Sequence, residues 1–256
     1  MRFAFRSHTG ERPKNEDAGR ILDLDERHLL VVVADGMGGH AGGEVASALA
    51  VDTLVREVTA RWPVPSSEWP ALLVEAVRAA NRAVYTASRI DPAVAGMGTT
   101  LDAVLIGREA GLVAHVGDGR AYLYRSGVLV RLTDDHSYVG ELLRRGEISE
   151  AEAEVHPRRN VILRAVGTEA EVAVDLVPFD WRPGDGLLVC TDGLSKALPE
   201  AEIAAVFAGE AIRDVERLAD RLLETALRRD ASDNITVAVV AGAPADGSPA
   251  GGGMRR

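Results

Sequence analysis

Strand-like and helix-like segments follow one another in blocks in this sequence, not in regular alternation. Apolar runs and period-two patterns predict strands, and apolar positions spaced about 3.6 residues apart predict helices. The predicted strands are residues 2–8, 17–24, 28–34, 98–107, 110–117, 120–125, 128–132, 172–178, 186–191 and 234–242. The predicted helices are residues 41–60, 68–89, 199–207 and 212–229. Because the strands cluster and the helices come in pairs, we expect a layered α+β sandwich with largely antiparallel sheets.

The composition excludes several classes of protein. The chain has 256 residues and a net charge of −10, which argues against a nucleic-acid binder because such proteins usually carry a basic face. Its single cysteine, Cys190, cannot form an intrachain disulfide, and we expect a reducing compartment. Neither a signal peptide nor a membrane-spanning run is evident. We therefore expect a cytoplasmic protein that contacts neither nucleic acid nor membrane.

No linker interrupts residues 1–241, so we expect a single domain there. Residues 242–256 are rich in Gly, Pro and Ala, which predicts a disordered tail.

Four apolar segments carry an aspartate at one end, next to glycine or other small residues. Asp35, Asp118 and Asp192 follow such segments, and Asp233 precedes one. If these strands share one sandwich, the four acids can converge on a single rim. Crowded carboxylates repel one another and must either protonate or bind cations. Since oxygen ligands suit Mg²⁺ and Mn²⁺, the pattern predicts a divalent metal site.

Two other interpretations of these segments were weighed. A single Asp-Gly pair is more often a plain turn than a ligand, but the recurrence at four strand ends favours a site. The stretch "GMGGHA" at 36–41 also fits the glycine spacing of a dinucleotide loop. Asp35 would repel a pyrophosphate there, and the surrounding βαβ unit is missing. We therefore disfavour a dinucleotide site.

Six segments, taken in order, resemble the metal-dependent serine/threonine protein phosphatases of type 2C in their compact bacterial form. The segments are "GERPKNEDA" (10–18), "VVVADGMGGHAGGEVAS" (31–47), "GMGTTLDAVLI" (96–106), "AHVGDGRAYLYRSGVLVRLTDDHS" (114–137), "LLVCTDGLSKAL" (187–198) and "ASDNITVAVV" (231–240). The resemblance implies a four-layer α-β-β-α sandwich with two mainly antiparallel sheets flanked by helix pairs. It also implies that residues 1–241 are a catalytic domain and that residues 137–160 are its mobile flap.

The resemblance further implies a site for two Mn²⁺ or Mg²⁺ ions. In it Asp35 bridges both ions, Gly36 offers its carbonyl oxygen to one, and Asp192 and Asp233 complete the other.

Three more acidic residues match the family pattern around this site. Glu16 and Asp17 would orient metal-bound water. Asp118, together with Asp192, matches the carboxylates of a third, weaker metal. Gly119 stands where many relatives carry serine, and we expect it to loosen the loop near Asp118.

The family mechanism uses a hydroxide that bridges the metals to attack a phosphomonoester. Arg12 matches the phosphate-binding arginine, and its planar fork suits phosphate oxygens. Many eukaryotic relatives have a histidine two residues after the bridging aspartate as general acid. This chain has Met37 there, and its nearest histidine is His40. His40 as a proton donor and His40 packed beside the first helix both stay open.

These features together predict a protein serine/threonine phosphatase that hydrolyses phosphoserine and phosphothreonine and opposes a bacterial kinase. The expected partners are phosphorylated proteins and a cognate serine/threonine kinase, and we expect a monomer. A catalytically silent relative that serves as a binding module is disfavoured, because the core metal ligands are present. A phosphatase for a small metabolite, or for a regulatory partner in a sigma-factor cascade, is the third alternative.

Overall fold

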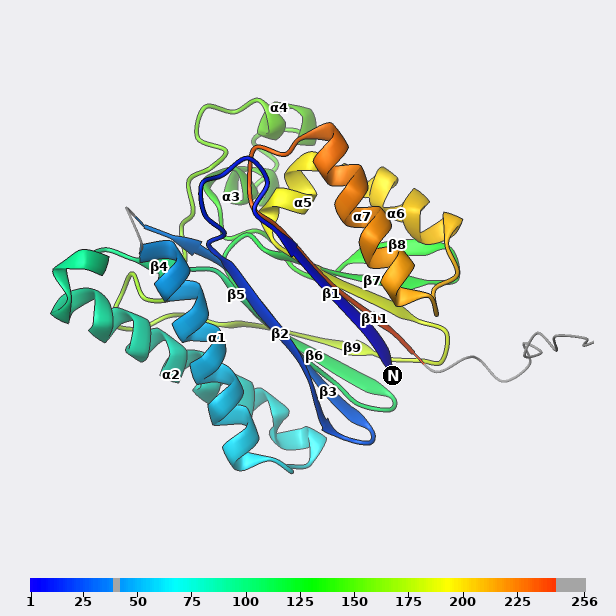
Figure 1. The fold of residues 1–256 in the computed structure, drawn as a ribbon, viewed down its shortest axis with the longest axis horizontal. Helices are drawn as coiled ribbons and strands as arrows, with labels where there is room; N and C mark the ends of the chain where they lie inside the picture. The colour runs from blue at the N-terminus through cyan, green and yellow to red at the C-terminus, as the bar shows by residue number, and fades with distance from the viewer. Residues whose placement is uncertain (39–41, 243–256) are drawn as a thin grey trace, which may run out of the picture.

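Two antiparallel sheets form the centre of the structure, a computed structural model that describes residues 1–38 and 42–242 (Figure 1). The first has the strand order β1-β11-β10-β7-β8, and the second has the order β2-β3-β5-β6-β9, with β4 paired to β3. The strands are β1 (Arg2–His8), β2 (Asp17–Asp25), β3 (His28–Met37), β4 (Gly98–Thr99), β5 (Leu101–Ile106), β6 (Ala110–Val116), β7 (Arg120–Arg125), β8 (Val128–Arg131), β9 (Asp175–Asp180), β10 (Gly186–Cys190) and β11 (Ile235–Ala241).

Helices cover the outer face of each sheet. Figure 1 shows α1 and α2 along the sheet that contains β2 and β3, and α6 and α7 along the sheet that contains β1 and β11. The helices are α1 (Gly42–Arg61), α2 (Trp69–Ile90), α3 (Tyr138–Arg144), α4 (Glu150–Glu154), α5 (Asp192–Ala197), α6 (Glu200–Gly209) and α7 (Val215–Arg229). The four-layer α-β-β-α sandwich expected from the sequence is confirmed.

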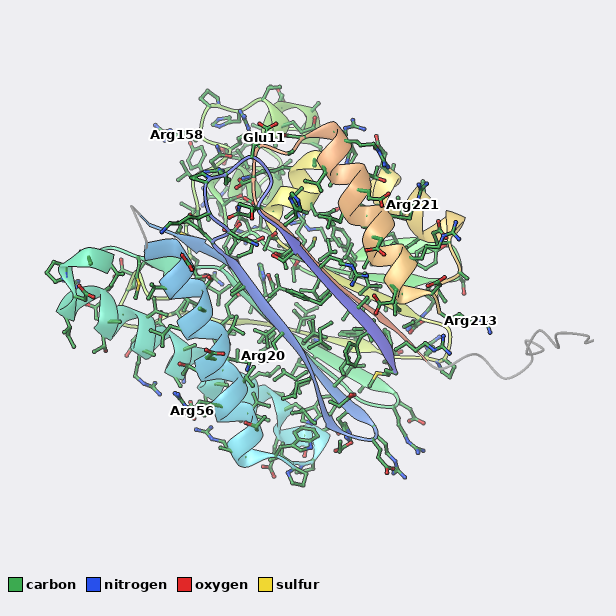
Figure 2. The ribbon with its side chains drawn as sticks, in the orientation of Figure 1. Glu11, Arg20, Arg56, Arg158, Arg213 and Arg221 are labelled. Atoms are coloured by element: carbon green, nitrogen blue, oxygen red, sulfur yellow. The ribbon has the colours of Figure 1, made fainter. Side chains whose placement is uncertain are left out.

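The central strands are apolar on both faces because both faces are covered. In β3, Leu30 and Val32 pack toward α1 and α2, whereas Val31 and Val33 pack into the layer between the sheets. Cys190 is fully buried in the core under the second helix layer, as a small apolar residue would be. Side chains fill the space between the layers in Figure 2, while labelled charged residues such as Arg56 and Arg221 lie on the periphery.

Helix α5 is the main element that the sequence patterns missed. It begins at Asp192, directly after β10, and is only six residues long, too short for a clear helical period. The strand predicted at residues 172–178 begins later, at Asp175, and reaches Asp180. Among the described residues, no helix combines the length and the apolar character needed to cross a membrane. The predicted tail lies outside the described residues, apart from Gly242.

The layer between the sheets should dominate stability. Leu187 is fully buried there, with Leu123 and Val240 as its partners on the neighbouring strands. We expect Leu187→Ala to lower the free energy of unfolding in urea by about 2–5 kcal/mol, because it leaves a cavity. Val130→Ala on the edge strand β8, where 48% of the residue is exposed, should cost less than about 0.5 kcal/mol. Equal losses would show that this layer is not the main source of stability.

Candidate functional site

Five aspartates from both sheets gather at one end of the sandwich. Asp17 on β2 lies directly opposite Asp35 on β3 in the strand register. Asp118 lies in the turn between β6 and β7, Asp192 opens α5 after β10, and Asp233 precedes β11. The charge of each of the other four carboxylates raises the pKa of Asp35, so all four lie near Asp35.

Burial and mutual repulsion disfavour the charged form of the carboxylates in this cluster. Burial, followed by repulsion from Asp192 and Asp233, raises the pKa of Asp17 to about 7, although hydrogen bonds from threonine side chains oppose the shift. Burial and the Asp192 charge likewise raise the pKa of Asp118 to about 7. The pKa of Asp35 lies well above its usual range for the same two reasons.

Several carboxylate oxygens in the cluster are buried and unpaired. Within residues 1–38 and 42–242, one oxygen each of Asp17, Asp118 and Asp192 is buried without a hydrogen-bond partner. An unsatisfied buried carboxylate oxygen is costly unless it takes up a proton or a cation. A set of donors made only of oxygen suits Mg²⁺ or Mn²⁺. The residues present therefore fit a divalent cation.

Two basic side chains reach the cluster. Lys196, on α5, forms an ion pair with Asp192. Arg12 places Nη2 3.1 Å from Asp233 Oδ1 and donates from Nε to the carbonyl oxygen of Ser232 at 3.0 Å. In this side-chain arrangement, the described residues contain no group of three or more Asp, Glu, His or Cys side chains that could together hold a metal ion. In this arrangement two of the acids are paired to basic groups.

Threonines hold the backbone of Asp35 in place. The Asp35 amide donates to Thr100 Oγ1 at 2.9 Å. The Asp35 carbonyl oxygen accepts from Thr99 Oγ1 and from the Thr100 amide, both at 2.8 Å. Both threonine hydroxyls are therefore engaged with the backbone of Asp35.

The glycines after the acids allow close approach between chain segments. A Cβ on Gly36 would overlap the carbonyl oxygen of Gly43, and a Cβ on Gly43 would lie 2.6 Å from Cδ of Glu16. A Cβ on Gly193 would overlap the carbonyl oxygen of Asn234. None of these three glycines has a positive φ. Their role is therefore to permit close packing of neighbouring segments and not to adopt a left-handed conformation.

Gly119 also packs closely, which corrects an expectation from the sequence. It was expected to loosen the loop beside Asp118. In the structure a Cβ at Gly119 would overlap Oδ2 of Asp102, a carboxylate buried in β5. A serine there would collide with Asp102, so in this chain the small residue permits a tight fit.

Asn234 is a functional residue that sequence reasoning missed. Its Oδ1 accepts from the Glu16 amide at 2.7 Å, and its Nδ2 donates to the carbonyl oxygens of Thr9 and Lys14 at 2.8 and 2.9 Å. Asn234 thereby fastens the N-terminal loop to the start of β11, next to Asp233. The signal available in the sequence was an asparagine placed between an acid and an apolar strand.

Most of the predicted site residues lie in this one region. The structure brings together Arg12, Glu16, Asp17, Asp35, Gly36, Asp118, Asp192 and Asp233. Burial raises the pKa of Glu16, against the opposing charge of Arg12. His40 lies outside the described residues. Lys196 was not singled out from the sequence, because its proximity to the acids depends on the short helix α5.

Comparison with known proteins identifies relatives along almost the whole chain. Residues 6–236 match the protein phosphatase 2C family. The serine/threonine phosphatase stp of Listeria innocua is 38% identical over 244 residues, which cover 94% of this chain and 95% of the relative. The serine/threonine protein phosphatase PstP of Mycobacterium tuberculosis is 41% identical over 93% of this chain and 44% of its own length.

A solved structure agrees with the fold. The crystal structure of the catalytic domain of a PstP, in complex with two manganese ions, has a TM-score of 0.81 and 38% identity. The match covers 93% of this chain and 96% of that one. This chain belongs to the protein phosphatase 2C family.

Proposed function

We propose that this chain is a metal-dependent protein serine/threonine phosphatase that hydrolyses phosphoserine and phosphothreonine residues. The observation that carries the proposal is the set of facing, partly unpaired carboxylates at one end of the sandwich. The solved relative with two manganese ions supports the same class of cofactor.

Asp35, Asp192 and Asp233, with the Gly36 carbonyl oxygen, would hold two Mn²⁺ or Mg²⁺ ions in this proposal. Asp118, with Asp192, would hold a third, weaker ion. When bound, such ions neutralise the acids, polarise the phosphate and lower the pKa of water.

Glu16 and Asp17 would orient water beside the ions. Two observations support this role for Asp17: Thr191 Oγ1 donates to its Oδ2 at 2.9 Å, and its Oδ1 is buried without a hydrogen-bond partner among the described residues.

Arg12 would bind the phosphate of the substrate. Its side chain is 53% exposed and is tethered through Nε to a backbone carbonyl oxygen, so the guanidinium stands at the mouth of the acid cluster. A guanidinium fork binds two phosphate oxygens at once and offsets their repulsion by the acids. A proton for the leaving alkoxide is also required, and His40 stays the proposed donor.

Residues 137–160 would act as the flap of a catalytic domain that spans residues 1–241. Ser137 caps α3, and Ser149 with Glu152 forms a capping box on α4, so the flap holds two short helices. The Tyr138 amide donates to the Val161 carbonyl oxygen at 2.8 Å, which ties the two ends of the flap together.

Phosphorylated proteins are the expected substrates. A cognate kinase, a monomeric state and a cytoplasmic location stay predictions from the sequence.

Replacing Asp233 tests the proposed metal site directly. Asp233→Asn should reduce Mn²⁺-dependent hydrolysis of both an aryl phosphate and a phosphothreonine peptide by on the order of 100-fold or more, because a charged ligand is lost. Asp230→Asn, three residues earlier and exposed, is the matched control and should keep activity. Full activity of the Asp233→Asn enzyme would refute the assignment.

Cation binding should stabilise the chain in a pH-dependent way. Asp17 and Asp118 have folded-state pKa values near 7, above the value of about 4 in an unfolded chain. Ionising them between these values therefore lowers the stability of the metal-free chain as pH rises. Because cations bind the ionised carboxylates, saturating Mn²⁺ should raise Tm more at about pH 8 than at about pH 5.

The measurement is thermal unfolding with Mn²⁺ or with a chelator at both pH values. Asp233→Asn should show a smaller Mn²⁺ effect at the higher pH. The same Tm increase at both pH values would contradict the cluster as the cation site.

The outer part of the flap should influence which phosphoprotein docks. It exposes Val155, of which 76% is accessible, beside the exposed Arg158 and Arg159. Exchanging residues 146–158 for those of a relative should change the kcat/KM ratio between phosphopeptides while leaving aryl phosphate turnover within about threefold, since the acid cluster is untouched. If aryl phosphate turnover were lost as well, the flap would belong to the chemistry and not to substrate choice.

A further inference from the structure

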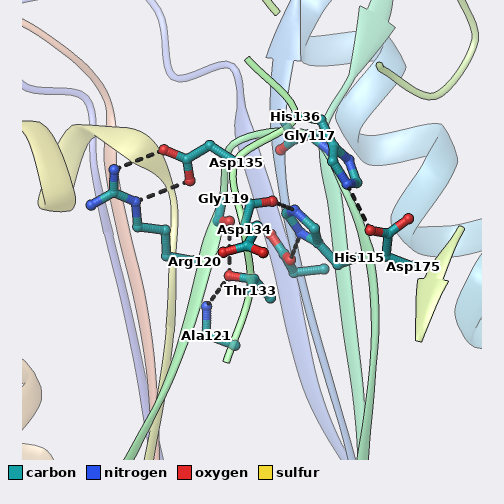
Figure 3. A network of polar contacts seen from close by, with 12 residues as sticks. His115, Gly117, Gly119, Arg120, Ala121, Thr133, Asp134, Asp135, His136 and Asp175 are labelled. Atoms are coloured by element: carbon teal, nitrogen blue, oxygen red, sulfur yellow. Dashed lines mark hydrogen bonds and ion pairs between the residues drawn. The ribbon is translucent and has the colours of Figure 1, made fainter. Parts of the chain in front are cut away.

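His136 uses every polar group it has. It lies between β8 and α3 and is 3% exposed. Its amide donates to the Gly117 carbonyl oxygen at 2.7 Å, and its Nδ1 accepts from the Gly117 amide at 3.1 Å. Its carbonyl oxygen accepts from the Leu163 amide at 2.7 Å, and its Nε2 lies 3.2 Å from Asp175 Oδ2 (Figure 3). One residue thus connects three separate chain segments.

These contacts determine the tautomer of His136. An amide N–H can only donate, and the Gly117 amide faces Nδ1, whereas Nε2 has the Asp175 carboxylate as an acceptor; the proton is therefore assigned to Nε2, which donates to Asp175. Arg164 Nη1 lies 3.0 Å from Nε2, but both are donors, and both share the Asp175 carboxylate. Burial, followed by the charge of the nearby His115, lowers the pKa of His136 to about 4, which agrees with a neutral ring.

A buried His–Asp pair supports the same turn from the other side. His115 lies 2.6 Å from Asp102 Oδ1 through Nδ1 and donates from Nε2 to the Asp134 carbonyl oxygen at 2.9 Å. The rings of His115 and His136 lie 4.5 Å apart. The second oxygen of Asp102 packs against Gly119. The turn is therefore hydrogen-bonded to His136 at its start and packs closely against Asp102 at its end.

The held turn is Gly117-Asp118-Gly119, which carries a carboxylate of the acid cluster. Gly117 has a φ of 118°, which side chains rarely adopt, and a Cβ there would lie 2.6 Å from Cβ of Thr100. A larger residue would therefore not fit at Gly117, and because the backbone of glycine is permissive, the position of the turn is set by its partners. Through Leu163 and the Ser137–Ile162 bridge, the same histidine is joined to the base of the flap.

We propose that His136 is a positioning residue that links the base of the flap to the turn carrying Asp118 and so directs that carboxylate toward Asp192. This inference rests on the proposed function. The bond that matters is the one from the Gly117 amide to Nδ1, because it acts on the residue directly before Asp118. A histidine needed only for packing would contribute to stability without affecting cation binding.

Three substitutions separate these possibilities. His136→Asn keeps an acceptor near the position of Nδ1 but loses the donor to Asp175. His136→Gln keeps a polar group near the position of Nε2 but offers no acceptor at Nδ1, and His136→Ala loses both. His156→Ala is the matched control, because His156 Nδ1 also accepts a backbone amide, that of Arg158 at 3.0 Å, in an exposed part of the flap.

The first measurement is the Mn²⁺ concentration for half-maximal hydrolysis of an aryl phosphate, with Mn²⁺ affinity measured separately by calorimetry. We expect His136→Ala and His136→Gln to raise the half-saturating concentration about 10-fold, as loss of outer supports of a metal site does. His136→Asn and His156→Ala should stay within about twofold of the unmodified enzyme. If His136→Ala does not fold, the comparison of Asn with Gln makes the same test.

The second measurement is NMR of the ¹⁵N-labelled chain without metal. The ring of His136 should show a protonated Nε2 and an unprotonated Nδ1. The Gly117 amide signal should move in the Gln variant and return toward its original position in the Asn variant. A protonated Nδ1 in the unmodified chain would overturn the inference.

The remaining outcomes are also decisive. Wild-type Mn²⁺ dependence in both the Ala and Gln variants, or an Asn variant as impaired as the Ala variant, would overturn the positioning role. If the unmodified chain hydrolyses no phosphomonoester with Mn²⁺, the proposed function fails. Calorimetry with Mn²⁺ would still decide whether His136 directs Asp118.

Discussion

Repulsion among buried carboxylates is the interaction on which the rest of this structure depends. Asp17, Asp35 and Asp118 all have pKa values raised by burial and by their neighbours. Left unneutralised, such a cluster destabilises the folded state. The same property supports the proposed cation site, because a divalent ion there would remove both the repulsion and the unpaired oxygens. In the proposed function, activity would thus be gained at a local cost in stability.

The remainder of the molecule keeps these acids from moving apart. Asp35, Asp118, Asp192 and Asp233 lie at or beside the ends of strands whose apolar side chains are buried between layers, so these strands cannot shift without exposing core residues. Asp17 begins β2, which is only partly buried but pairs with β3 along its length. Local hydrogen bonds then fix the positions of the chain segments next to the acids. Thr99 and Thr100 hold the backbone of Asp35, and Asn234 holds the loop before Asp17. In the proposed role, His136 does the same for Asp118.

Much of the fold and the acidic members of the site could be predicted from the sequence. Strands that are buried on both faces appear in the sequence as apolar runs. An aspartate at the end of such a run can be recognised without a structure. The short helix α5 could not be predicted, because six residues carry too little periodicity. Asn234 and Lys196 were missed for a different reason. Their roles come from contacts with residues far away in the chain, such as Asn234 with Glu16, 218 positions earlier.

The sequence by itself determined the order of strands and helices, the placement of acids at strand ends, and the excess of negative charge. These follow from local periodicity and composition, which need no knowledge of partners. The tertiary structure alone decided that acids from two sheets share one end, that Gly119 packs on Asp102, and that His136 joins Leu163 to Gly117, the residue before Asp118. Those outcomes depend on which distant segments meet when the layers pack, and no local pattern carries that information.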